Sequence, residues 1–342
     1  MDNIKKILVT GGSGFIGSNF IVDQLKNHKN SICNLDKLTY ASSLESLKKI
    51  ENYSNYKFVK GDIIDSKLIE KILKQYKPNY IINFAAESHV DRSIEKPLEF
   101  INSNIVGVAN LLININKYYT SNKNTINKDF KFLHVSTDEV YGSLKFNEKP
   151  FTENSVYNPS SPYSASKAAS DLLVKAWNKT YNLPVIVSHC SNNYGPYQFL
   201  EKLIPLVITN CLLEKEIPVY GTGENIRDWI HVQDHCDALN KILIHGFVGE
   251  TYNIGGDMEK SNLDVIHIIC NILNNIKPRI NGKAYEELIT FVNDRPGHDL
   301  RYAISNKKIY SSLKWKPFVN FNEGIKDTIL WYINNEKWWK SN

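Results

Sequence analysis

The sequence has few of the features that mark secreted, metal-stapled or membrane-bound proteins. Its five cysteines are odd in number and widely spaced, and no two form a C-x-x-C pair, so we expect neither a disulfide framework nor a metal site. These cysteines are Cys33, Cys190, Cys211, Cys236 and Cys270. No apolar run approaches the roughly 20 residues that span a bilayer, and no signal-peptide pattern precedes the first predicted strand. We therefore expect a cytoplasmic protein with reduced thiols and no membrane partner.

A concentrated basic region is also missing. The formal net charge is +5, but the lysines are scattered among asparagines and isoleucines and form no stripe interleaved with aromatic residues. We expect a solvated surface and no nucleic-acid partner. With 342 residues, 42% of them hydrophobic and 23% charged, the chain has the composition of a globular protein and the length for two domains.

The first half of the chain alternates short apolar runs with longer helical segments. Strands are predicted at 7–10, 32–35, 56–60, 80–84, 132–136 and 184–188, and helices at 15–27, 66–75, 98–119 and 164–181. Strands separated by helix-length connections favour an α/β fold in which helices cover both faces of a parallel sheet. The sequence therefore predicts a Rossmann-type, doubly wound sheet.

Beyond residue 190 the pattern loosens around one predicted helix at 201–213. A helix at 232–245 and a strand at 251–254 are expected to rejoin the first domain. We predict a cofactor domain at 1–190, to which the chain returns at about 230–256. Residues 191–229 and 257–342 are predicted to form a smaller α+β substrate domain.

A glycine-rich turn follows the first predicted strand. Gly11 permits a tight turn, Gly14 lets the backbone approach a diphosphate, and Gly17 allows close packing of helix on strand. The N–H groups at the start of the following helix attract that diphosphate. Asp36, at the end of the second strand, favours ribose hydroxyls and repels a 2′-phosphate, although Lys37 weakens this preference. The pattern predicts NAD as the cofactor.

Tyr163 and Lys167 are four residues apart at the start of a predicted helix, so they share one helix face. A lysine ammonium next to a phenol lowers the pKa of the phenol. The tyrosine can then accept a hydroxyl proton while hydride leaves the same carbon. Y-x-x-x-K is also common as a surface pair, but its place after the fifth strand favours catalysis.

The triplet Thr137-Asp138-Glu139 ends that fifth strand, where open α/β sheets place ligands. Two carboxyl groups can supply a general acid and a general base, which elimination of water requires. Their pKa values must then be held apart by their surroundings. The alternative is structural, with Asp138 as a helix N-cap and Glu139 in the first turn.

The motifs together resemble one family. The Gly11-x-x-Gly14-x-x-Gly17 spacing is typical of extended short-chain dehydrogenase/reductases. The segments DKLTY (36–40), FAAESHVDRS (84–93), STDEVYG (136–142), SNNYGPY (191–197) and DRPGHD (294–299) are similar to those of the dTDP-glucose 4,6-dehydratases. They span the chain from residue 7 to about 303. A departure is Leu200, where the family has proline before Glu201.

The resemblance implies a hydro-lyase of nucleotide-sugar metabolism and deoxysugar biosynthesis. Tyr163 would remove the C4 hydroxyl proton while Thr137 binds that hydroxyl, with hydride passing to NAD. Glu139 would then remove the C5 proton as Asp138 protonates the departing C6 hydroxyl. Hydride would return to C6, giving dTDP-4-keto-6-deoxyglucose. Lys167 would also hold the nicotinamide ribose.

The resemblance also implies binding residues and an assembly. The residues implied for the cofactor are Gly11, Gly14, Phe15, Ile16, Gly17, Asp36, Lys37, Thr39, Asp62, Ile63, Phe84, Ala85, Ala86, Ser88, Ser103, Tyr163, Lys167 and Asn193. Those implied for dTDP-glucose are Ser88, Thr137, Asn192, Lys202, Leu203, Pro218, Tyr220, Arg227, Asn262, Arg295 and His298. Asp62 has an alternative role as a helix N-cap. A homodimer is expected through the helices at 98–119 and 164–181.

Three alternatives stay open. A 4-epimerase on the same scaffold would not need the Asp138-Glu139 pair, and a GDP-mannose dehydratase would favour NADP, against Asp36. A dehydratase that acts on a UDP-sugar is also an alternative, because its substrate differs only slightly from dTDP-glucose. A non-catalytic NAD-binding regulator would not need Tyr163 and Lys167 together with the carboxyl pair.

Overall fold

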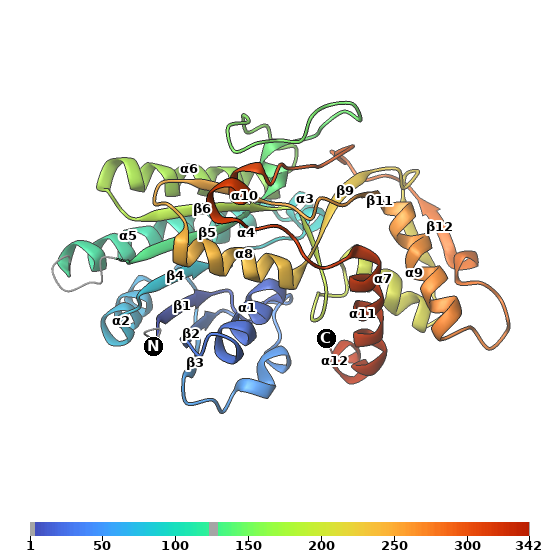
Figure 1. Cartoon of the computed structure of the whole chain (residues 1–342), viewed down its shortest axis with the longest axis horizontal. Coiled ribbons are helices and arrows are strands. Elements are labelled where there is room, and N and C mark those ends of the chain that lie inside the picture. The colour runs from blue at the N-terminus through green and yellow to red at the C-terminus, as the bar shows by residue number, and fades with distance from the viewer. Residues whose placement is uncertain (1–3, 123–128, 342) are drawn as a thin grey trace.

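The computed structural model describes residues 4–122 and 129–341, and a seven-stranded sheet forms its larger part (Figure 1). Its strands are β1 (Lys6–Thr10), β2 (Ser31–Asp36), β3 (Tyr56–Lys60), β4 (Tyr80–Asn83), β5 (Lys131–Thr137), β6 (Val185–Cys190) and β10 (Thr251–Ile254). All neighbouring strands are parallel, in the order β10-β6-β5-β4-β1-β2-β3. The chain winds outward in both directions from the β1–β4 pair, which confirms the Rossmann-type fold and places a ligand crevice at that switch point.

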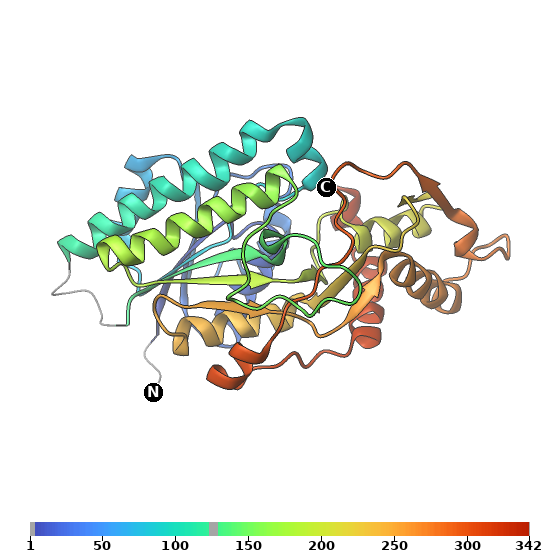
Figure 2. The ribbon, with the colours of Figure 1, turned by 90° about the horizontal axis from the view of Figure 1, so that it is seen from above.

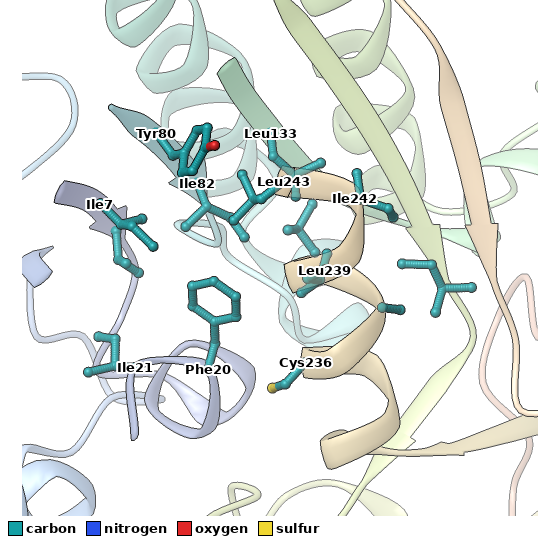
Figure 3. Packing of buried hydrophobic residues seen from close by; sticks show 14 of the residues in the cluster. Ile7, Phe20, Ile21, Tyr80, Ile82, Leu133, Cys236, Leu239, Ile242 and Leu243 are labelled. Carbon is teal, nitrogen blue, oxygen red and sulfur yellow. The ribbon is translucent and has the colours of Figure 1, made fainter. Parts of the chain in front are cut away.

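Helices cover both faces of this sheet, as seen from above in Figure 2. The long helices are α1 (Phe15–Lys26), α2 (Ser66–Tyr76), α5 (Gly107–Ser121), α6 (Pro162–Tyr181) and α8 (Val232–His245). Figure 3 shows α1 and α8 on one face, where Phe20 and Leu239 meet Ile82 of β4. On the other face α2, α5 and α6 pack on Leu8 and Phe132. Because alternate side chains of each strand point to opposite faces, the strands are apolar on both.

Local sequence signals account for where the helices begin. The side chain of Asp65 accepts a hydrogen bond from Leu68 N and caps α2, so the alternative role of Asp62 as that cap is wrong. Helix α6 begins with Pro162 in its first turn and a capping box in which Ser161 and Ser164 bond reciprocally. Asp62 instead accepts a hydrogen bond from Ile64 N at 3.1 Å and lines the pocket described below.

The helix predicted at 98–119 consists of three joined pieces. These are α4 (Pro97–Phe100), the π-helical turn η2 (Ile101–Val106) and α5. Together Pro97–Ser121 form a run of 25 residues that is long and apolar enough to cross a membrane, contrary to the expectation from sequence. About 44% of its apolar window is buried inside the protein.

A second, smaller group of elements forms the other end of the molecule (Figure 1, right). Strands β7 (Asn192–Tyr194), β9 (Ile226–His231) and β11 (Glu259–Ser261) form one sheet, and β8 (Ile217–Tyr220) pairs with β12 (Ile289–Val292). They pack with α7 (Leu203–Leu212), α9 (Asn262–Ile276), η4 (Tyr285–Leu288), α11 (Phe321–Asn334) and α12 (Glu336–Lys340). The sequence predicted α7 but not the three strands between residues 192 and 231.

Short helices complete the connections. They are η1 (Leu44–Ile50), α3 (Val90–Glu95), η3 (Asp138–Tyr141) and α10 (Lys307–Leu313). The aromatic tail packs on the second group, where Trp331 and Trp338 lie edge-on to Tyr197 with ring centroids 4.7 and 5.7 Å away.

Candidate active site

A pocket opens at the carboxyl ends of the central strands, and it collects most of the predicted site residues. All five predicted catalytic residues and all eighteen predicted cofactor residues line it. Ser88, Thr137, Asn192 and Lys202 of the predicted substrate set also line it. The lining residues that sequence reasoning missed are Leu35, Ala41, Ser42, Gly61, Glu87, Val135, Ser136, Cys190, Ser191, Gln198, Phe199 and Glu201. Many of these directly flank predicted residues at strand ends, which is the signal that could have identified them.

The glycine turn between β1 and α1 has the shape that a dinucleotide requires. Gly11 has a φ of +72°, and a Cβ there would lie 2.5 Å from the backbone nitrogen of Ala85. A Cβ on Gly17 would lie 2.5 Å from the carbonyl oxygen of Gly11, so α1 can approach β1 only without a side chain. At Gly14 the nearest atom would be 3.4 Å away, which leaves space beside the backbone at the helix start.

Asp36 lines the pocket from the end of β2. Its two carboxylate oxygens accept hydrogen bonds from Ser13 N and Leu38 N, both at 2.8 Å, which fixes the side chain at the end of β2. Burial raises the pKa of Asp36, and these hydrogen bonds oppose that rise. Lys37 turns aside to pair with Asp62 at 3.0 Å. The residues present therefore fit the adenosine ribose of NAD.

Thr137, Asp138 and Glu139 form the junction of β5 and η3. The hydroxyl of Thr137 accepts a hydrogen bond from Glu139 N at 3.3 Å, so Thr137 caps the turn and the alternative role of Asp138 as its cap is wrong. Asp138 is 2% exposed, and its Oδ2 has no hydrogen-bond partner among the described residues. Both carboxyl groups line the pocket, which a purely structural role does not require.

The two carboxyl groups have different electrostatic surroundings. Burial, followed by the charges of Glu139 and Asp228, raises the pKa of Asp138 well above its usual value. Burial also raises the pKa of Glu139, but Arg295, Arg227 and Lys202 oppose that rise. Both pKa values are raised, but more cationic groups oppose the rise at Glu139, so Asp138 is the better placed of the two to keep a proton, as an acid–base pair needs.

Tyr163 and Lys167 face the pocket from the first turns of α6. Phe100 lies edge-on to Tyr163 with ring centroids 6.3 Å apart, and Lys167 Nζ donates to the carbonyl oxygen of Val135 at 2.9 Å. Burial and then Glu139 raise the pKa of Tyr163 well above its usual value, whereas a hydrogen bond with Thr137 lowers it. The expected depression of this pKa is therefore not found, because the phenol is buried and near two carboxyl groups, while Lys167 points its ammonium at Val135.

Seven predicted substrate residues lie outside the pocket lining, in the second group of elements. They are Leu203, Pro218, Tyr220, Arg227, Asn262, Arg295 and His298. Arg227 donates to the carbonyl oxygen of Asp299 at 3.0 Å and stacks 4.3 Å from the ring centroid of Tyr302. Arg295 pairs with Asp91 at 3.6 Å, and His298 lies 2.6 Å from Asp294. Arg295 and Arg227 nevertheless oppose the burial-driven rise in the pKa of Glu139, so both lie close enough to act on its charge.

Comparison with known proteins gives consistent matches over the whole chain. The family model described as GDP-mannose 4,6 dehydratase matches residues 8–328. The chain is 52% identical to a dTDP-glucose 4,6-dehydratase of Escherichia coli over 98% of this chain and 95% of that one. It is 51% identical to the dTDP-glucose 4,6-dehydratase of Neisseria meningitidis over 99% of this chain and 96% of the relative.

Solved structures agree. The dTDP-glucose 4,6-dehydratase of Bacillus anthracis in complex with NAD has a TM-score of 0.87 at 44% identity, covering 98% of this chain and 99% of that one. That of Streptomyces venezuelae, with NAD and TYD bound, has a TM-score of 0.90 at 40% identity over 98% and 99%. The UDP-glucose 4-epimerase of Thermotoga maritima shares the fold at a TM-score of 0.84 but only 26% identity, over 97% and 99%.

Proposed function

The chain belongs to the dTDP-glucose 4,6-dehydratase family, and we propose that it is the hydro-lyase that converts dTDP-glucose to dTDP-4-keto-6-deoxyglucose in nucleotide-sugar and deoxysugar biosynthesis. The observation that carries this proposal is the joint presence of Asp138 and Glu139 with Tyr163 and Lys167 in one pocket. The first pair supplies an acid and a base for elimination, and the second supports oxidation at C4.

NAD is the cofactor that this pocket fits, because the glycine turn, Asp36 and the strand ends form a continuous dinucleotide surface. Bound NAD would supply a hydride acceptor for C4 and a hydride donor for C6, so no net oxidation would occur. Asp36 would bind the adenosine ribose and the α1 start the diphosphate. Lys167 and Asn193 would lie at the nicotinamide end, with Ser88 and Ser103 beside them.

For the oxidation, Tyr163 would take the proton of the C4 hydroxyl while Thr137 holds that hydroxyl by a hydrogen bond. The pKa of Tyr163 is raised in the structure, so its ionisation depends on positive charge arriving nearby. Lys167 supplies one such charge from the same helix face.

For the elimination, the C4 ketone acidifies the C5 proton, and Glu139 would remove it. Asp138 would deliver a proton to the C6 hydroxyl so that it leaves as water. The surroundings of the two carboxyl groups support this assignment, because burial and then Glu139 raise the pKa of Asp138 well above its usual value, whereas Arg295, Arg227 and Lys202 oppose the rise at Glu139. Exchanging the roles would require Glu139 to stay protonated next to Arg227 and Arg295, which oppose that state.

Substrate recognition would use residues of the pocket lining together with residues of the second group of elements. We propose that Asn192, Lys202 and Leu203 contact the sugar nucleotide, that Pro218 and Tyr220 frame the base, and that Arg227, Asn262, Arg295 and His298 bind the nucleotide end. An arginine fork donates two hydrogen bonds at once, which suits a diphosphate. The division into a cofactor domain (1–190 and about 230–256) and a substrate domain (191–229 and 257–342) follows from the same proposal.

A homodimer and a cytoplasmic location also belong to the proposal. Helices α5 and α6 lie side by side on one face of the molecule (Figure 2). Apolar side chains on and next to them are exposed, including Leu98 (70%) and Leu172 (58%). Such a patch on a face of two long helices supports contact with a second copy of the chain, which would make a symmetric interface.

Incubation of the purified protein with dTDP-glucose and, separately, UDP-glucose tests the function. The expected result is a 4-keto-6-deoxy product, seen by its alkali-induced absorbance, formed faster from dTDP-glucose. Preferential conversion of UDP-glucose would move the proposal to the UDP-sugar dehydratases, and a 4-epimer would identify an epimerase. Bound NAD with every sugar nucleotide unchanged would support a regulatory protein instead.

A further inference from the structure

A fully buried carboxylate lies one helical turn beyond the proposed catalytic lysine. Asp171 follows Lys167 by four residues on α6, so the two side chains share one helix face. Asp171 is 0% exposed and Lys167 is 3% exposed. Isolated burial of either charge would be very costly, so each one needs the other or an equivalent partner.

The structure holds Asp171 in place from two strands. Its Oδ2 accepts a hydrogen bond from Ser136 Oγ of β5 at 2.9 Å and lies 3.0 Å from His189 Nε2 of β6. Its Oδ1 has no hydrogen-bond partner in the described part of the chain and lies 3.5 Å from His134 Nε2. Burial raises the pKa of Asp171, but His189, His134 and Lys167 together lower it below its usual value, so the group is a carboxylate.

Lys167 is a buried cation, so burial acts against its charged form. Burial lowers its pKa, and two groups oppose that effect, Asp171 first and Cys190 second. Burial raises the pKa of Cys190 to about 12, so this thiol carries no charge at neutral pH. Burial and Lys167 lower the pKa of His134 to about 3, so this imidazole is neutral and does not compete with Lys167 for Asp171. At neutral pH, Asp171 is therefore the anion that favours the charged form of Lys167.

Other titratable groups surround the pair on every side. The groups on the pocket side are Tyr163, Asp138 and Glu139. The two neighbouring strands contribute His134 from β5 and His189 and Cys190 from β6. The groups on the outer side are Tyr141, Tyr157 and Lys175. Tyr157 lies 3.1 Å from His189 Nε2 and receives a hydrogen bond from Lys175 Nζ at 2.8 Å. Tyr157 contacts Asp171, and all three of these outer residues lie outside the pocket lining.

We propose that Asp171 is a positioning residue: from one turn along the same face of α6, its buried carboxylate is the counter-charge that keeps Lys167 an ammonium in the pocket lining. The inference rests on the proposed function, because it concerns the lysine of the C4 oxidation. Asp171 does not touch the pocket itself and acts through Lys167. Its removal should therefore change the ionisation of the oxidation step more than the binding of substrate or NAD.

The test compares Asp171→Asn with Tyr157→Phe in the NAD-loaded enzyme, measuring kcat and KM for dTDP-glucose across the pH range. Without the carboxylate, the pKa of Lys167 falls further, so the alkaline limb of kcat should move to lower pH by about one unit or more. The maximum kcat should fall with little change in KM or NAD content. Tyr157→Phe alters the same cluster but keeps the carboxylate of Asp171, so the alkaline limb of its kcat should stay at the wild-type pH. An unmoved limb in Asp171→Asn would overturn the proposal.

A second measurement covers the case in which Asp171→Asn does not fold. In the wild-type protein with ¹⁵N-labelled lysines, assigned with Lys167→Met, the Lys167 nitrogen should have the chemical shift of an ammonium at neutral pH. A neutral amine there would overturn the proposal. Because this readout needs no turnover, it separates failure of the Asp171 inference from failure of the proposed reaction, which the wild-type assay with dTDP-glucose reports.

Discussion

Asp138 and Glu139 are neighbours in the chain, and their carboxyl groups differ in charge environment. Asp138 is buried with an unpartnered Oδ2 and is pushed toward its protonated form by Glu139. Glu139 faces the positive charges of Arg227 and Arg295. The proposed division between acid and base follows from this asymmetry, and each half of it can be tested separately.

Asp138→Asn should remove the proton donor for the C6 hydroxyl and leave C4 oxidation in place. Loss of a positioned general acid typically costs about 10²–10⁴-fold in rate. The measurement is the rate of product formation together with exchange of the C5 proton in deuterated water. C5 exchange should continue through Glu139 while dehydration stops, and normal dehydration would contradict the role of Asp138.

Tyr163→Phe should stop the reaction at its first step. The variant keeps the ring that packs on Phe100 and loses the hydroxyl that takes the proton, so it should fold and bind NAD normally. We expect a loss of about 10²–10⁴-fold in kcat, with no accumulation of NADH during single turnovers. Tyr157→Phe removes a hydroxyl outside the pocket lining and serves as the matched control. Retained NADH formation in Tyr163→Phe would assign the base to another group.

Two glycines in the same turn should separate folding from cofactor binding. Gly17→Ala places a Cβ 2.5 Å from the Gly11 carbonyl oxygen, so α1 must shift, at a cost of about 1–3 kcal/mol in the free energy of unfolding. Gly14→Ala meets nothing closer than 3.4 Å, so the ligand-free protein should keep its stability and lose NAD affinity. Chemical denaturation and NAD titration of both variants check this, and equal stability losses would be the contrary result.

Asp36→Asn should weaken NAD binding and relax its preference over NADP. The amide removes the negative charge that repels a 2′-phosphate, and a lost hydrogen bond to a charged group is worth about 1.5–3 kcal/mol. Titration of both cofactors by protein fluorescence measures the change. An unaltered ratio of the two affinities would show that Asp36 does not set the preference.

The exposed apolar face gives a prediction about assembly. Leu172→Asp on α6 places a charge in the proposed interface, and such a charge is costly to bury without a partner. Sedimentation should show a dimer for the wild-type chain and a monomer for the variant. Phe247→Asp, at another exposed apolar position that is 62% exposed, is the control and should stay dimeric. A monomeric wild-type chain would contradict the proposed homodimer.

The sequence predicted the seven-stranded sheet well because its strands are apolar on both faces and are separated by helices of clear length. It did not predict β8, because this short strand gains its pairing from β12, about seventy residues later, and carries little signal of its own.

The cofactor side of the pocket was predictable because its residues flank strand ends. The tyrosine pKa was predicted in the wrong direction, because sequence spacing shows Lys167 near Tyr163 but hides the burial and the facing carboxyl groups. Asp171 was missed because an acidic residue four positions after a lysine is also typical of an exposed helical ion pair.

The most direct test of the central claim is a single turnover of Glu139→Gln with dTDP-glucose, followed by the absorbance of NADH. Without a base at C5, oxidation at C4 should proceed and elimination should not, so NADH should form and persist with no 4-keto-6-deoxy product. Glu148→Gln, on an exposed loop, should behave as wild type. If Glu139→Gln dehydrates dTDP-glucose at the wild-type rate, the assignment of acid and base to this pair is wrong.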